Sequence, residues 1–261
     1  MTLKKAIFKI PLDILAFLLR QSKDAVYYLV NEGLRDDIKT AVDVAYAHEH
    51  IENACFLARK YENTGGGVIL DVGGGAATTA LRFSKYFPEK QVYIFEPIAY
   101  SFDVIRKTAN NRPDWILINK AVGSKSGTSK INISNRITAS SLLEMQNEVS
   151  GYESILVAER EETIQIVTLD ETIGDEICVS VLKIDVQGFE LEVLKGAENT
   201  LKKTSVIVLE VNNHQGFRGA PTYFEIDEFL RARDFELFDL YPSLRSDGRL
   251  QDWDAIYVKQ K

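Results

Sequence analysis

Cysteine is scarce in this chain, with only two among 261 residues, Cys55 and Cys178. Both stand among apolar neighbours and lack the spacing of metal ligands, so neither a disulfide framework nor a cysteine–zinc site is predicted. We interpret them as reduced, buried thiols, which are typical of a cytoplasmic protein.

A basic excess is also missing, because the net charge is −7 and the pI is about 5.2. A dedicated nucleic-acid binder needs a basic footprint, so nucleic acid is not expected as a partner. The 45% hydrophobic and 26% charged residues are typical of an ordinary globular protein. The length suits one large α/β domain with an appendage.

Long apolar runs are absent as well. Residues 10–19 come closest, but Pro11 and Asp13 interrupt them, the run is too short to cross a bilayer, and no cleavage site follows. Apolar residues at helical spacing predict instead a helical extension over residues 1–64, ending in a glycine-rich joint. We expect this extension to act as a lid or a homodimer contact, with a membrane-surface helix as the alternative.

From residue 65 onward, expected strands alternate with expected helices. This order predicts an α/β fold with a doubly wound, mainly parallel seven-stranded sheet, whose last two strands form an antiparallel edge pair. An insertion over residues 124–165 breaks the rhythm, with a strand expected over 130–134 and a helix over 141–149. The expected strands of the main sheet are 68–71, 91–96, 115–119, 179–185, 206–211, 235–239 and 255–258, and the expected helices are 76–86, 98–110, 189–201 and 224–231.

A glycine-rich turn, residues 73–75, follows the first of these strands. Glycines allow close backbone approach, and the amides of the next helix can bind a polar ligand, so a dinucleotide site and an S-adenosylmethionine (SAM) site both fit. The dinucleotide fingerprint requires a small residue where Thr78 stands. Asp71 would repel a pyrophosphate but suits the cationic aminoacyl end of SAM. The predicted cofactor residues of this segment are Asp71, Gly73, Gly75 and Thr78.

Two further segments complete the predicted cofactor site. The second strand ends in Glu96, which can accept hydrogen bonds from vicinal ribose hydroxyls, and Pro97 stiffens the turn behind it. After the third strand, Ala121 and Val122 belong to a loop expected to cover an adenine ring. Glu96 suits either nucleoside cofactor, so an NAD-dependent oxidoreductase of Rossmann type remains an alternative.

In their order, these motifs resemble the FkbM family of SAM-dependent methyltransferases, over roughly residues 66–259. The most specific carrier is the run from Leu182 to Glu190, followed by residues 193–197. The resemblance implies the class I methyltransferase fold, SAM as cofactor, and O-methylation of a sugar, a glycan or a natural-product small molecule. One departure is the turn itself, where the family usually reads Gly-Ala-Asn-x-Gly and this chain has three glycines followed by Ala76 and Ala77. The supporting motifs are residues 71–73, 95–97, 121–123 and 168–170.

Methyl transfer to a hydroxyl requires an aligned acceptor and a group that takes its proton. The catalytic candidates, all near strand ends, are Asp185, Glu210 and His214, and Asp185 is also expected to border the cofactor. His214 is the better base without a metal, because the pKa of histidine lies near neutrality. Asp185, Glu210 and Asn212 would alternatively suit Mg²⁺, and spacing alone does not decide. A non-catalytic nucleoside-binding module is the remaining alternative.

Overall fold

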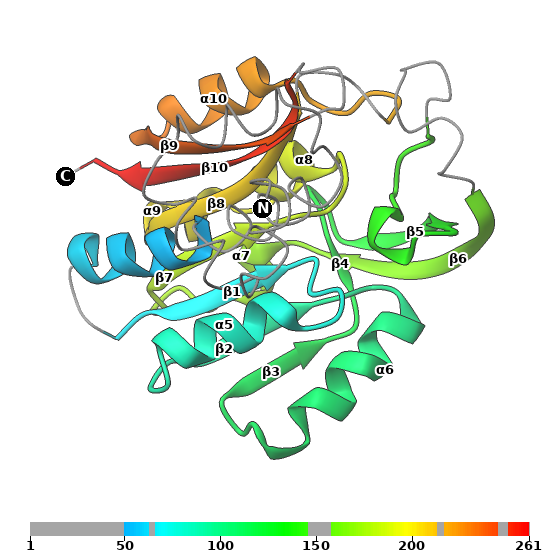
Figure 1. The fold of residues 1–261 in the computed structure, drawn as a ribbon, viewed down its shortest axis with the longest axis horizontal. Helices are drawn as coiled ribbons and strands as arrows, with labels where there is room; N and C mark the ends of the chain where they lie inside the picture. The colour runs from blue at the N-terminus through cyan, green and yellow to red at the C-terminus, as the bar shows by residue number, and fades with distance from the viewer. Residues whose placement is uncertain (1–49, 63–65, 146–157, 213–216, 245–249, 261) are drawn as a thin grey trace, which may run out of the picture. The chain divides into compact units, whose positions relative to one another are not determined.

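The computed structural model describes residues 50–62, 66–145, 158–212, 217–244 and 250–260 (Figure 1). The chain divides between residues 52 and 53, and the fold described below is that of the second part. Most of the predicted extension over residues 1–64 lies outside the described residues, so its boundary and its role as lid or dimer contact stay predictions. Within the described ranges, no helix combines the length and the apolar character needed to span a membrane.

A seven-stranded sheet forms the centre of the domain, in the order β3-β2-β1-β7-β8-β10-β9. The first five strands in this order are parallel, and β10 runs antiparallel to both β8 and β9. The predicted α/β fold, with a mainly parallel sheet and an antiparallel edge pair, is therefore confirmed. The strands are β1 (Val68–Val72), β2 (Val92–Phe95), β3 (Trp115–Ile118), β7 (Val179–Ile184), β8 (Thr204–Asn212), β9 (Phe235–Leu244) and β10 (Leu250–Lys259).

Every residue of β1 and β7 is buried, as expected for central strands of a sheet covered on both faces. The helix expected over residues 189–201 is divided in two at Gly196. A side chain there would meet the carbonyl oxygen of Gly123 at 2.0 Å, so the close approach of that loop requires glycine. The helices that connect the strands are α5 (Thr78–Tyr86), α6 (Ala99–Thr108), α7 (Leu169–Thr172), α8 (Glu190–Lys195), α9 (Glu198–Lys202) and α10 (Tyr223–Arg231), with short 3-10 turns η1 (Ala109–Asn111) and η2 (Ile137–Ala139).

Parts of the insertion, together with residues that flank it, form a second sheet of three strands in the order β4-β6-β5 (Figure 1). These are β4 (Ala121–Val122), β5 (Gly127–Ser134) and β6 (Ala158–Val167), so the strand expected over 130–134 is confirmed and lengthened. The prediction of a helix over 141–149 is wrong for residues 141–145, the part that the structure describes. Ser141 pairs with Asn132 and Met145 with Phe217 as isolated β-bridges, and this tertiary pairing overrides the weak local helical pattern.

Candidate functional site

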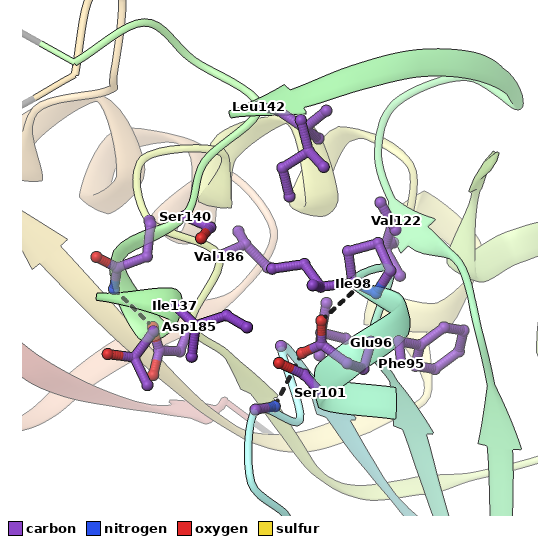
Figure 2. A pocket seen from close by; sticks show the side chains of 18 of the residues that line it. Phe95, Glu96, Ile98, Ser101, Val122, Ile137, Ser140, Leu142, Asp185 and Val186 are labelled. Carbon is purple, nitrogen blue, oxygen red and sulfur yellow. Dashed lines mark hydrogen bonds between the residues drawn. The ribbon is translucent and has the colours of Figure 1, made fainter. Parts of the chain in front are cut away.

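A cavity opens at the carboxyl ends of β1, β2 and β7 (Figure 2). Its walls come from the glycine turn after β1, the start of α6, strand β4, the insertion and the turn after β7. Figure 2 shows Glu96 and Asp185 on opposite sides of this space. The sequence-predicted residues that line the cavity are Gly73, Gly75, Glu96, Pro97, Ala121, Val122 and Asp185.

The glycine turn is held tightly between its two neighbouring strands. Gly73 and Gly74 both donate their N–H groups to the carbonyl oxygen of Phe95 at 3.0 Å. Gly73 has a φ of 86°, and a side chain on it would meet the carbonyl oxygen of Asp185 at 1.9 Å. Only glycine therefore fits at position 73, where the turn passes close to the backbone of Asp185.

Glu96 presents a fixed carboxylate to the cavity. Glu96 is only 4% exposed. Its two carboxylate oxygens accept hydrogen bonds from the N–H groups of Gly75 at 2.9 Å and Ile98 at 2.8 Å. Burial raises the pKa of Glu96 to about 7, although these backbone donors oppose the rise. A carboxylate has about four lone-pair sites, so two remain for a vicinal pair of hydroxyls.

Asp71 and Thr78 take positions that the sequence did not indicate. Asp71 lies fully buried behind the glycine turn rather than on the cavity wall, and burial raises its pKa. Its nearest cation is the ammonium of Lys183, whose Nζ is 3.5 Å from Asp71 Oδ1. Thr78 is exposed at the first turn of α5. The structure thus places Asp71 beside Lys183, and its contact with the aminoacyl end of a cofactor stays a prediction.

Lys183 connects three parts of the site, although the sequence assigned it no role. Its Nζ donates to the carbonyl oxygen of Gly73 at 3.2 Å and lies 3.4 Å from Asp185 Oδ2. Burial lowers the pKa of Lys183, but the charges of Asp185 and Asp71 outweigh this and raise it, so the ammonium form is retained. The signal that would have indicated this role is a lysine in a strand whose other residues are uncharged and buried.

Asp185 and Glu210 are linked through a side chain that the sequence did not single out. The amide nitrogen of Gln187 donates to Asp185 Oδ1 at 2.9 Å and to Glu210 Oε2 at 2.8 Å. Burial, and then the charge of Asp185, raise the pKa of Glu210 well above its usual range. The Asp185 side chain is 44% exposed and lies beside the Lys183 ammonium, so the two carboxyl groups have different environments.

The predicted magnesium set does not fit this arrangement. An amide nitrogen, which cannot ligate Mg²⁺, lies between Asp185 and Glu210. Asn212 lies opposite Asp252 in the β8–β10 pair. Across the described ranges, no cluster of three or more His, Cys, Asp or Glu side chains is arranged to hold a metal ion. The other catalytic candidate, His214, lies outside the described residues.

The turn after β7 depends on two more residues without a predicted role. Glu190 is buried, and its carboxylate accepts hydrogen bonds from the N–H groups of Val186 at 3.2 Å and Gly188 at 3.0 Å. Burial raises the pKa of Glu190 to about 7. Ser141, from the insertion, donates its hydroxyl to the carbonyl oxygen of Gln187 at 2.6 Å. The insertion also contributes cavity-lining residues, namely Ile131, Ile137, Thr138, Ser140 and Leu142.

Comparison with known proteins agrees with this architecture. The methyltransferase FkbM domain matches residues 58–237, more than half of the chain. The chain is 28% identical to the hexuronic acid methyltransferase AglP of Haloferax volcanii over 148 residues, 56% of each protein, so the match spans about half of that relative. It is 25% identical to the 2-O-methyltransferase NoeI of Sinorhizobium fredii over 184 residues, 67% of this chain and 74% of NoeI.

Among solved structures, the magnesium protoporphyrin IX methyltransferase of Synechocystis PCC 6803 aligns with a TM-score of 0.47 and 7% identity, covering 95% of this chain and 97% of that one. The extent of the domain match, rather than this distant likeness, decides the family. The chain belongs to the FkbM family of methyltransferases.

Proposed function

We propose that this protein transfers the methyl group of SAM to a hydroxyl of a sugar, a glycan or a natural-product small molecule. The observation that carries the proposal is that one cavity joins Gly73, Glu96 and Asp185, so a nucleoside-binding wall faces a carboxylate. The names of the two relatives support a sugar acceptor in one case and an oxygen acceptor in the other.

The cavity wall suits the parts of a nucleoside cofactor. Glu96 offers lone pairs to ribose hydroxyls, and apolar groups at Val122, Ile98 and Leu142 offer surface to an adenine ring. Gly75 leaves open space beside its Cα, because a methyl group there would meet no atom within 4 Å. When bound, SAM supplies an activated methyl group on a sulfonium.

Asp185 is the proposed proton acceptor for the hydroxyl of the acceptor molecule. Lys183 and Gln187 each contact one of its carboxylate oxygens, and these two contacts orient the carboxylate. Glu210, whose pKa is raised, is proposed to stay protonated and to donate a hydrogen bond. Two carboxyl groups in different environments can divide the roles of proton acceptor and hydrogen-bond donor between them.

The test is transfer of radiolabelled methyl from SAM to a panel of neutral sugars, uronic acids, glycans and polyols. The wild type is expected to label at least one acceptor, and Asp185→Asn is expected to bind SAM normally but to lose transfer. Calorimetry with SAM and with NAD accompanies the assay. Tighter binding of NAD would contradict the proposal in favour of an oxidoreductase. SAM binding without transfer to any acceptor would favour a non-catalytic binding module, and full transfer by Asp185→Asn would exclude Asp185 as the proton acceptor.

A further inference from the structure

The Asp185 and Glu210 carboxyl groups approach each other from the ends of neighbouring parallel strands, β7 and β8. The oxygens of two carboxyl groups at such a place need a cation, a shared proton or a hydrogen-bond donor between them. Here the donor is the Gln187 amide, with N···O distances of 2.9 and 2.8 Å. The two hydrogen atoms of one NH₂ group therefore satisfy both carboxyl groups.

The backbone at Gln187 is constrained in a conformation that side-chain-bearing residues rarely adopt. Its φ is 56°, in the left-handed region, and the next residue, Gly188, has a φ of 97°. The hydroxyl of Ser141 binds the carbonyl oxygen of Gln187, and the Glu190 carboxylate binds the N–H groups on either side of it. Three side-chain contacts from two segments thus stabilise one turn, as in sites where strained backbone serves a function.

Close packing keeps this turn in place from outside. A side chain at Gly188 would meet atoms of Ala220, Phe217 and Leu143 at 3.1 to 3.3 Å. The turn therefore has little room to relax, and the Gln187 amide stays between the two strand ends.

Asp185 is oriented through both of its oxygens. Oδ1 accepts the hydrogen bond of Gln187, and Oδ2 lies 3.4 Å from the Lys183 ammonium. These two contacts set the plane of the carboxylate, which borders the cavity that Asp185 lines. Removing the amide would release Oδ1 from this contact and allow the carboxylate to rotate.

We propose that the Gln187 amide occupies the place that a divalent cation would otherwise take between Asp185 and Glu210, which makes Gln187 the positioning residue of a metal-independent site. The expected change in kcat rests on the proposed function. The contacts of Gln187 with Asp185 and Glu210 can be tested without an acceptor.

The kinetic test compares Gln187→Met, which keeps length and volume, with Gln165→Met, an exposed glutamine of β6 that serves as the matched control. We expect Gln187→Met to lower kcat about tenfold or more while the affinity for SAM stays within about twofold. In a Glu210→Met background the same substitution should cost much less, because its second partner is already gone. EDTA should not change the wild-type rate. Unchanged kcat in Gln187→Met, or loss with EDTA and recovery with Mg²⁺, would overturn the proposal.

A second measurement needs no acceptor and separates this proposal from the proposed function. Thermal midpoints of Gln187→Met, Glu210→Met and the double variant should be non-additive, with the double variant losing less than the two single losses together. Addition of MgCl₂ should leave the wild-type midpoint unchanged, since a bound cation would raise it. Additive losses or a magnesium-dependent rise would overturn the role of Gln187, whereas failure to methylate any acceptor would count against the proposed function alone.

Discussion

Lys90 and Glu62 form a buried ion pair at the amino ends of β1 and β7, with side chains 3% and 7% exposed. Lys90 Nζ lies 2.9 Å from both Glu62 oxygens, and the same carboxylate accepts hydrogen bonds from Gly67 N–H and the Ser180 hydroxyl, each at 2.7 Å. Burial raises the pKa of Glu62, but these hydrogen bonds and the Lys90 charge outweigh it and lower the pKa.

The substitution Lys90→Met removes the cation and leaves the carboxylate buried. Breaking a buried pair costs about 3–5 kcal/mol, and the lower end applies because Ser180 and Gly67 still donate to Glu62. A loss of about 3 kcal/mol lowers the thermal midpoint of a domain of this size by roughly 10 °C. Scanning calorimetry or circular dichroism at neutral pH would measure this change.

The sign of the pH dependence gives a sharper check. In the wild type the lowered pKa of Glu62 contributes stability that is present above its ordinary value of 4.5 and is lost as the pH falls through the lowered pKa. Without Lys90 the buried carboxyl group binds a proton more readily, so the stability gap between variant and wild type should narrow as the pH is lowered from 7 to 5.

The matched control is Lys130→Met, which removes the exposed Lys130–Glu161 pair and should leave the midpoint unchanged. A Lys90→Met midpoint equal to that of the wild type at pH 7, or a gap of the same size at pH 5, would refute this account of the ion pair.

Three further outcomes are expected. Gly73→Ala should abolish SAM binding in calorimetry, because the new methyl group would collide with Asp185; unchanged affinity would contradict this. The affinity for SAM should fall as the pH drops below about 7, where Glu96 takes up a proton, and Glu96→Gln should bind weakly at every pH; a pH-dependent Glu96→Gln would exclude that carboxyl group as the cause. Lys183→Met should lose methyl transfer and lower the melting midpoint, since two carboxylates lose their shared ammonium; wild-type rates would rule out that role.

Much of the site can be predicted from local patterns in the sequence. The glycine turn and Glu96 both follow strands whose apolar character is evident in the sequence, and both line the cavity. Asp185 is predictable in the same way, as an acid delivered by an apolar strand to the carboxyl edge of a sheet. These predictions succeed because each depends on a strand and the turn that directly follows it.

Contacts between segments that are distant in the sequence cannot be predicted from such local patterns. Asp71 and Lys183 are direct neighbours in the β1–β7 register, and this pairing places the Asp71 carboxylate beside the lysine ammonium. Ser141 falls within a segment expected to be helical, because nothing in its local sequence indicates the pairing with Asn132 or the hydrogen bond to Gln187.

The sequence by itself determined the seven strands of the main sheet in their order along the chain, the family, and the acids that end the strands. Only the tertiary structure decided which of those acids face the cavity, which share Lys183, and that an amide lies between the two carboxyl groups that could otherwise have suited Mg²⁺. The physical reason is that strand periodicity and turn chemistry act over a few neighbouring residues. The pairing of Asp185 with Glu210 instead requires β7 and β8 to be aligned side by side.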